Sequence, residues 1–324
     1  MRWTRLAVLV GCLAIGMGFA QGRKICFGYQ DLETEFWVAG HAAIVKALKD
    51  KGFQVIERNA NQDANKQLEQ IKDCISQKVE GILIIPQDGE SAVTIIGEAN
   101  RAGIPIAVFN RPPSSDKNPA LVVVADNYTI SYNAVEFMAK QAIKQGKKKV
   151  KPLIMVGDLG DPNAVERKRG FDDVIKKYPN LFEKPVEVPT KWDAATGLRN
   201  LQSALQANPD VDFLFTSSDF LYPQIQAALA PLGKWKPIGD PKHVIMGGID
   251  GDARACSLMR QGYVDATGVQ DLFFEARAAL DALLKAIEAK ERTPKARILD
   301  KGFTLTQDNL KTDADKMWGC VIKK

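Results

Sequence analysis

The sequence predicts an α/β protein with two doubly wound parallel-sheet lobes, joined by a hinge of three chain crossings. Three observations predict this fold class. The chain has 324 residues, 45% of them hydrophobic, which is enough for two domains that each bury a core. Short apolar runs alternate with longer amphipathic stretches almost from end to end. Continuous apolar runs such as residues 82–85 favour strands covered on both faces, as parallel sheets require.

Residues 1–20 have the pattern of a secretory signal peptide. Two arginines precede an apolar run over residues 6–19, and small residues end at Ala20, where we expect cleavage. The run is shorter than the roughly 20 apolar residues of a membrane-spanning helix. A competing interpretation is lipid attachment at Cys12, which fits a short lipidation pattern. Both interpretations predict a periplasmic or otherwise extracytoplasmic protein.

The first lobe follows the signal peptide in regular order. Strands are expected at residues 24–29, 53–59, 81–86 and 106–110, and helices at residues 36–51, 64–78 and 90–102. Gly52 and Gly103 follow two of these helices and are expected to end them, because glycine readily adopts the left-handed conformation at a helix C-terminus.

The alternation then restarts. Strands are expected at residues 121–125, 152–156, 185–188, 213–216, 244–247 and 265–269, and helices at residues 131–145, 164–178, 195–207, 221–232 and 253–262. We assign residues 22–125 and 271–302 to the first lobe and residues 126–270 and 303–324 to the second, with crossings near Asp126, Gln270 and Gly302. Doubly wound sheets bind ligands at the carboxyl ends of their strands, so a cleft between the lobes would be lined from both sides.

Polar and aromatic residues collect just past these strands. They are Thr34, Phe36, Trp37, Asn110, Arg111, Asp161, Asn163, Trp192, Asp193, Ser218, Asp219, Asp250, Gln270 and Asp271. Amide, carboxylate and guanidinium groups bind hydroxyls in pairs, and aromatic rings cover the C–H face of a sugar, so this set suits a neutral polyol. Ordinary structural roles compete with this interpretation: Trp37 as core, and Asp219 or Asp271 as a helix cap.

Several classes of function are disfavoured. The net charge of +5 is spread thinly apart from the lysine-rich segment 144–151, which lacks interleaved aromatics, so we expect no nucleic-acid partner. The chain has neither a nucleophile-elbow pattern nor a phosphate-binding loop, and we expect its two histidines, His41 and His243, to be structural or exposed. We therefore expect no catalytic residue and no cofactor, with an exported carbohydrate-active enzyme as a weaker alternative.

Five short segments carry a family resemblance over about residues 24–310. They are Glu-Phe-Trp at 35–37, Val-Phe-Asn-Arg at 108–111, the stretch 161–171, Ile-Asp-Gly at 249–251 and Ala-Thr-Gly-Val-Gln at 266–270. In this order they resemble the type I periplasmic binding proteins of monosaccharide ABC transporters, such as the ribose-binding and glucose/galactose-binding proteins.

The resemblance implies a ligand-binding role for particular residues. Phe36 or Trp37 from the first lobe and Trp192 from the second would stack on the sugar. Arg167 matches the family arginine that binds the ring oxygen and hydroxyls. The other polar contacts would come from Asn110, Arg111, Asp161, Asn163, Asp250 and Gln270.

The chain also departs from the family pattern. Thr34 stands where relatives usually carry asparagine or aspartate, and Ser218 where they usually carry asparagine. Both side chains are shorter, which implies a larger pocket or one open to an added substituent, so the identity of the sugar is not fixed. The glucose/galactose-binding members have a calcium loop where this chain has segment 144–151, whose lysines offer no oxygen ligands. We therefore expect no structural calcium and no other metal.

Together these expectations define one function. The chain is expected to be the monomeric substrate-binding protein of an ABC transporter, which captures a monosaccharide or related polyol by hinge closure and delivers it to the membrane permease. A receptor that feeds a chemotaxis or sensor-kinase system is the alternative. A sugar-responsive repressor is disfavoured because the signal peptide stands where its DNA-binding helices would lie.

Besides Cys12, the chain has four cysteines. Cys26 lies in an apolar strand, where a buried free thiol is the ordinary interpretation, but whether Cys26 and Cys74 are free is left open. Family members often end soon after the last crossing, here about residues 304–310, whereas this chain continues with an apolar tail. We expect the tail to dock on the second lobe, close to Cys256, and predict a disulfide between Cys256 and Cys320.

Overall fold

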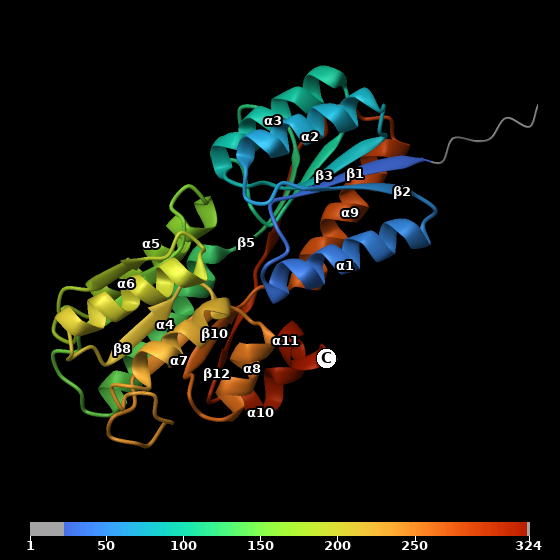
Figure 1. Ribbon diagram of the computed structural model, residues 1–324. Coiled ribbons are helices and arrows are strands. Elements are labelled where there is room, and N and C mark those ends of the chain that lie inside the picture. Colours follow the sequence, from blue (N-terminus) through green and yellow to red (C-terminus); the bar gives the residue numbers. More distant parts are fainter. Residues whose placement is uncertain (1–22, 323–324) are drawn as a thin grey trace, which may run out of the picture.

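The computed structural model describes residues 23–322, which form two α/β lobes (Figure 1). The expected signal peptide at residues 1–20, with the alternative lipidation site at Cys12, lies outside the described residues. Across residues 23–322, no helix combines the length and the apolar character needed to cross a bilayer.

The first lobe is built on a six-stranded parallel sheet in the order β11-β5-β4-β3-β1-β2. Its strands are β1 (Lys24–Tyr29), β2 (Gln54–Asn59), β3 (Gly81–Ile85), β4 (Ile106–Phe109), β5 (Leu121–Ala125) and β11 (Ala296–Asp300). Helices α1 (Glu35–Asp50) and α9 (Leu272–Glu288) cover one face, and α2 (Ala64–Ser76) and α3 (Gly89–Ala102) cover the other (Figure 1). Leu83 and Ile85 pack in one hydrophobic cluster, and Ile82 and Ile84 in another. The apolar run 82–85 is therefore buried from both faces, as expected.

The second lobe is built on a six-stranded sheet in the order β12-β10-β9-β8-β6-β7. Its strands are β6 (Pro152–Val156), β7 (Val186–Pro189), β8 (Phe213–Thr216), β9 (Ile245–Asp250), β10 (Ala266–Val269) and β12 (Phe303–Thr306). The main helices are α4 (Asn127–Lys144), α5 (Pro162–Lys177), α6 (Ala194–Ala207), α7 (Tyr222–Leu229) and α8 (Ala253–Arg260). A 3₁₀ turn η1 (Asp219–Leu221) precedes α7, and the tail forms α10 (Leu310–Asp313), η2 (Ala314–Lys316) and α11 (Trp318–Val321).

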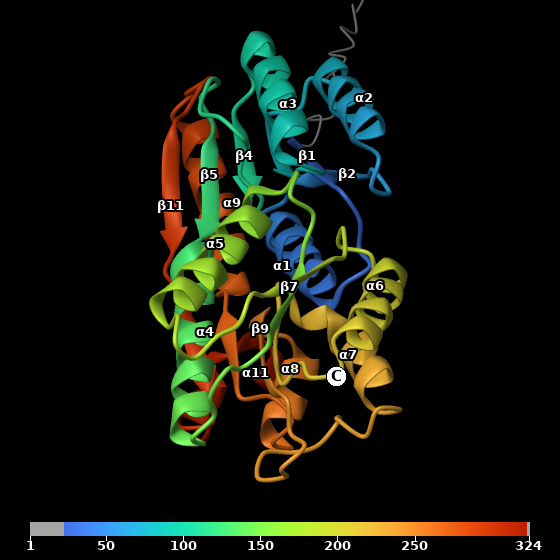
Figure 2. The same ribbon diagram turned by 90° about the vertical axis from the view of Figure 1, so that its left-hand side faces the viewer.

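The chain passes between the two sheets three times: between β5 and α4, between β10 and α9, and between β11 and β12. Figure 2 shows β5 and β11 side by side as they run toward the second lobe. β11 ends at the cleft and β12 begins there, so β12 enters the second sheet from the carboxyl ends of its strands. It consequently pairs with β10 in the antiparallel direction, an exception to the parallel sheet that the sequence predicts.

Most elements begin and end within a few residues of their expected bounds. Helix α4 starts at Asn127 instead of residue 131, because the Asp126 side chain caps it by accepting a hydrogen bond from the Thr129 N–H. Helix α7 ends at Leu229 instead of residue 232, since Pro231 has no N–H to continue it. Helix α9 and the strands β11 and β12 are absent from the expected elements.

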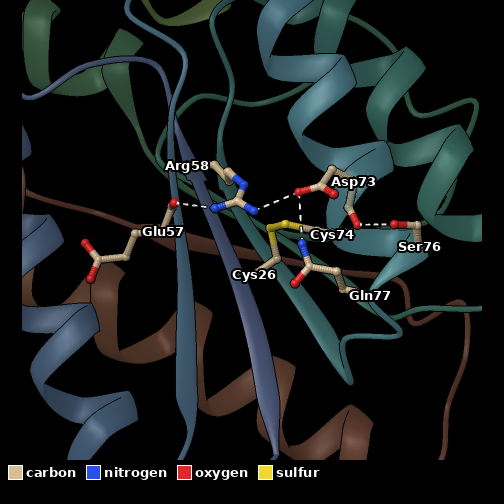
Figure 3. Close-up of a disulfide and its surroundings, with 7 residues drawn as sticks. All are labelled: Cys26, Glu57, Arg58, Asp73, Cys74, Ser76 and Gln77. Atoms are coloured by element: carbon tan, nitrogen blue, oxygen red, sulfur yellow. Dashed lines mark hydrogen bonds and ion pairs between the residues drawn. A yellow bond between two sulfur atoms is a disulfide. The ribbon is translucent and has the colours of Figure 1, made fainter.

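Residues 23–322 contain two disulfides. One joins Cys256 to Cys320, the pair that the sequence predicts, with their Cα atoms 5.3 Å apart. The other joins Cys26 to Cys74, whose state the sequence left open, so Cys26 is not a free buried thiol. Both of these residues are fully buried, because β1 turns Cys26 toward the face that α2 covers, and their Cα atoms lie 6.0 Å apart. Figure 3 shows this bond near Arg58, whose guanidinium donates to an Asp73 carboxylate oxygen of α2.

Candidate functional site: a polar cavity between the lobes

One cavity lies between the lobes, where the strands of both sheets reach their carboxyl ends. All twelve residues predicted to bind a ligand line it: Thr34, Phe36, Trp37, Asn110, Arg111, Asp161, Asn163, Arg167, Trp192, Ser218, Asp250 and Gln270. Eight other residues also line it, and sequence reasoning missed them: Gln30, Asp31, Glu33, Gln62, Gln87, Asp158, Lys191 and Phe220. The signal was present, because each of these follows a strand by the same rule as the twelve.

Helix N-termini fix several of these side chains. Thr34 caps α1 by accepting a hydrogen bond from the Trp37 N–H, which places Phe36 and Trp37 in the first turn. Asp161 caps α5 by accepting one from the Asn163 N–H at 2.9 Å. Asp271 has the capping role anticipated for it, with the Phe274 N–H as donor.

Asp219 does not cap a helix by its side chain. It is fully buried, and its Oδ2 accepts hydrogen bonds from the Gly251 N–H at 2.7 Å and the Thr267 hydroxyl at 2.8 Å. Asp219 therefore fixes the backbone that follows Asp250, instead of facing the cavity itself.

Arg167 and Asp250 form the centre of the second lobe's polar surface. Arg167 Nε donates to Asn127 Oδ1 at 2.7 Å, and its Nη1 donates to the Ser217 carbonyl at 2.6 Å and lies 3.0 Å from Asp250 Oδ1. Asp250 also accepts from the Gln270 amide at 2.7 Å and from the Ser218 hydroxyl. Burial raises the pKa of Asp250, and the charge of Arg167 opposes that rise. The donors from Arg167, Gln270 and Ser218 fix the position of this carboxylate.

The two lobes contact each other across the cavity. Arg111 of the first lobe and Asp161 of the second form a buried ion pair, with Nε 2.9 Å from Oδ2, although the N–H does not point at that oxygen. Asn163 Nδ2 donates to the Asn110 carbonyl at 3.1 Å. Backbone contacts between Gly89 and Gly160 and a bond from the Ala253 N–H to the Glu35 carboxylate add to these. The structure is therefore a closed arrangement of the lobes.

Two tryptophans contribute aromatic surface from opposite lobes. Trp37 is half-buried, and the Arg111 guanidinium lies 5.7 Å from its ring centroid. The Arg167 guanidinium lies 5.8 Å from the centroid of the Trp192 ring, and the Trp192 indole N–H donates to Asp161 Oδ2. A Cβ atom at Gly157 would lie 2.2 Å from the Trp192 ring, so only glycine lets the indole lie flat against this backbone.

Backbone strain is concentrated at the cavity. Asn110, Trp192 and Asp250 have φ angles of 65°, 57° and 122°, values that residues other than glycine seldom adopt. Such strained residues persist where surrounding contacts over-determine them, and they cluster at ligand-binding sites.

Gln30 is the clearest ligand-facing group that sequence reasoning missed. It is 1% exposed, yet neither its amide nitrogen nor its amide oxygen has a hydrogen-bond partner among the described residues. Gln87 Oε1 is also buried and has no hydrogen-bond partner among the described residues. A buried amide without partners is unfavourable by about 1–3 kcal/mol, and a ligand hydroxyl can both donate to it and accept from it.

Comparisons with known proteins agree with this arrangement. The family model described as a periplasmic binding protein domain matches residues 25–291. The D-apiose import binding protein of Actinobacillus succinogenes is 25% identical over 249 residues, 76% of either chain. The ribose import binding protein of Bacillus subtilis is 27% identical over 266 residues, 80% of either chain. The crystal structure of a galactofuranose binding protein superposes with a TM-score of 0.79 and 20% identity, covering 91% of this chain and 98% of that one.

Proposed function

This chain belongs to the periplasmic binding protein family, and from that premise we propose that it captures one monosaccharide or related polyol for an ABC importer. One observation carries the proposal: the cavity is closed from both lobes by paired hydrogen-bonding side chains and by two tryptophans. The import functions of the apiose-binding and ribose-binding relatives support it.

The lining of the cavity favours a neutral, compact ligand. Carboxylates outnumber cations: Asp31, Glu33, Asp158, Asp161 and Asp250 against Arg111, Arg167 and Lys191. This balance disfavours sugar acids and sugar phosphates. The centres of water molecules can occupy a volume of about 70 Å³ in the closed cavity. This volume holds several waters or a small polyol, but it does not hold an oligosaccharide.

We propose hinge closure as the mechanism, with residues 22–125 and 271–302 moving against residues 126–270 and 303–324. Contacts to the ligand from both lobes favour the closed population by their differential affinity, and the permease then recognises the closed form. The protein acts outside the cytoplasm, as a monomer and without catalysis. In support, His41 pairs with Glu57 and His243 with Asp265, and neither histidine lines the cavity.

A ligand screen tests the proposed function directly. A bound ligand at about 100 times its dissociation constant adds about 2.7 kcal/mol of stability, so thermal unfolding should shift upward by several degrees. We expect shifts with one or more neutral pentoses, hexoses, inositols or short polyols, and none with sugar acids, sugar phosphates or amino acids. Calorimetry then gives the affinity. The absence of a shift with every neutral polyol would argue against the proposal.

Trp192→Phe is expected to remove most of the change in tryptophan fluorescence that a ligand causes. The indole lies at the cavity, so a stacked sugar displaces water from its ring. Trp235→Phe is the matched control, because that indole stacks on Tyr263 at 4.8 Å and does not line the cavity. An undiminished signal in Trp192→Phe would assign the stacking role to Trp37 instead.

A further inference from the structure

All three crossings of the hinge meet at one residue, Asp300, which ends β11. Its carbonyl accepts a hydrogen bond from the Asp126 N–H at 2.8 Å. Its Oδ2 accepts one from the Asp271 N–H at 2.6 Å, and its Oδ1 accepts one from the Gly302 N–H at 2.9 Å. Asp300 is 5% exposed. Asp300 therefore links the three crossing segments, two through its carboxylate and one through its backbone carbonyl.

A second carboxyl group, that of Glu275 in the first turn of α9, is buried against this hinge. Glu275 is fully buried, and its Oε2 accepts a hydrogen bond from Asn110 Nδ2 at 2.9 Å. Its Oε1 has no donor among the residues that the structure describes, and its side chain lies within hydrogen-bonding reach of the Asp300 carboxylate. Two carboxyl groups can make a hydrogen bond only when one of them carries a proton.

The hydrogen-bond geometry assigns this proton to Glu275, because both carboxylate oxygens of Asp300 already accept N–H bonds and Glu275 Oε1 accepts none from the described residues. Burial, and then the negative charge of Asp300, raises the pKa of Glu275 well above its usual value, and the opposing effects of Asn110 and Arg167 are smaller. Burial also raises the pKa of Asp300, but the N–H bonds from Gly302 and Asp271 lower it. Asp300 is therefore the ionised partner.

Other charged groups around α9 do not neutralise the pair. The strands β3, β4 and β5, which pack against α9, contain no ionisable side chain. In α1, Glu35 bonds to the Ala253 N–H and His41 to Glu57. The remaining ionisable residues of α1 are exposed: Lys46, Lys49 and Asp50. Arg297 of β11 is exposed as well.

Glu275 is connected to the ligand cavity through Asn110. The two hydrogens of Asn110 Nδ2 are shared between Glu275 Oε2 and Gln270 Oε1, the latter at 3.0 Å. Its Oδ1 is thereby turned toward the second lobe, where it accepts from Asn163 Nδ2 at 3.2 Å. Gln270 in turn donates to Asp250. The hinge and the cavity are joined by one continuous chain of hydrogen bonds.

We propose that Glu275 is a positioning residue whose proton bridges to Asp300 and couples closure of the hinge to the ligand cavity. The inference rests on the proposed function, because it concerns the regulation of the same site. Loss of the proton would place two negative charges at the point where the three crossings meet and would weaken the closed arrangement.

The sign of the pH dependence follows from this. In this proposal closure shields Glu275 from water, because Asn110, which contacts Glu275, is held by Asn163 of the second lobe. The closed form then binds the proton more tightly than the open form. The contribution to closure is fully present below the open-form pKa and is lost as pH rises through the higher, closed-form pKa. Between these two values the dissociation constant of the ligand should rise by up to about tenfold per pH unit.

The test compares Glu275→Gln and Glu275→Ala with the unmodified protein, by calorimetry with a ligand from the screen, from about pH 5 to about pH 9. Glutamine can donate to Asp300 and accept from Asn110, so Glu275→Gln should keep the low-pH affinity within about threefold and lose the pH dependence. Glu275→Ala should bind about tenfold more weakly at low pH. Glu183→Gln, the same substitution at an exposed residue of the second lobe, should keep the original profile.

Two outcomes would overturn the inference. One is an unmodified protein whose affinity does not change with pH, or a Glu275→Gln variant that retains the change. The other needs no ligand: a ¹³C carboxyl titration in which Glu275 titrates near its ordinary pKa of about 4.3. The failure of the proposed function is distinguishable from the failure of this inference. If no polyol binds, the proposed function fails. The hinge coupling still stands if the pKa of Glu275 is raised and Glu275→Gln removes a pH-dependent opening of the lobes seen by small-angle scattering.

Discussion

Replacing Arg167 by alanine should weaken ligand binding by about a hundredfold or more and lower the free energy of unfolding by about 3–5 kcal/mol. Arg167 and Asp250 are 4% and 8% exposed, so the substitution leaves a buried carboxylate without its cation. From the sequence only the loss of binding is expected, with the fold intact. The structure adds the stability cost, because Asn127, Ser217 and Asp250 are held together through this one guanidinium.

Calorimetry with the screened ligand and urea unfolding measure the two effects of Arg167→Ala. Arg169→Ala is the matched control: this arginine is two residues away on the same helix, its side chain is 55% exposed, and it pairs with Glu166. It should change neither quantity. Arg167→Lys should bind with intermediate affinity, since lysine keeps the charge and loses the planar fork. Full affinity in Arg167→Ala would show that the cavity is assigned wrongly.

Removing the second disulfide, by replacing Cys256 and Cys320 with alanine, should lower the free energy of unfolding by about 4 kcal/mol. The bond closes a loop with a sequence separation of 64 residues, and the entropy lost by the unfolded chain grows with loop length. Ligand affinity should fall as well. The disulfide holds α11, whose Trp318 indole N–H donates to the Asp250 carbonyl at 2.8 Å.

The same double substitution at Cys26 and Cys74 is the control. That bond has a sequence separation of 48 residues, so the loss of stability should be similar, but it lies in the first lobe between β1 and α2 and has no contact with Asp250. Ligand affinity should therefore be retained. Urea unfolding with and without reductant measures the stabilities. Peptide mapping that finds all four cysteines alkylated before reduction would contradict the basis of both predictions.

The alternating strands and helices were predictable because their signals are local. Each apolar run in the first lobe is long enough to identify a buried strand, and the glycines and capping residues mark where helices end and begin. The twelve cavity residues followed from a general rule, that parallel sheets bind ligands at their strand ends, together with the family resemblance. Applied to every strand, the same rule also points to Gln30 and Gln87.

The remaining features depend on distances that no local pattern encodes. The strands β11 and β12, on either side of the predicted crossing near Gly302, went unrecognised because most of their residues are exposed or only partly buried and form no continuous apolar run. The pairing of Cys26 with Cys74 depends on which face of β1 meets α2. Glu275 looks like an ordinary polar residue of an amphipathic helix until packing buries it beside Asp300.

The position of Trp318 also determines when the protein becomes competent to bind. Under the proposed export, a chain that emerges from its N-terminus delivers residue 318 after the strands of both sheets. Until it arrives, the Asp250 carbonyl lacks its indole donor, and Gly319 is not yet in place against Asp252, which it meets so closely that a Cβ atom would lie 2.1 Å from the Asp252 carbonyl carbon. We therefore expect a precursor still held in the secretion channel to have its first lobe's early strands assembled and to retain no ligand. In that order of events, docking of the C-terminal segment would complete the support of the Asp250 backbone.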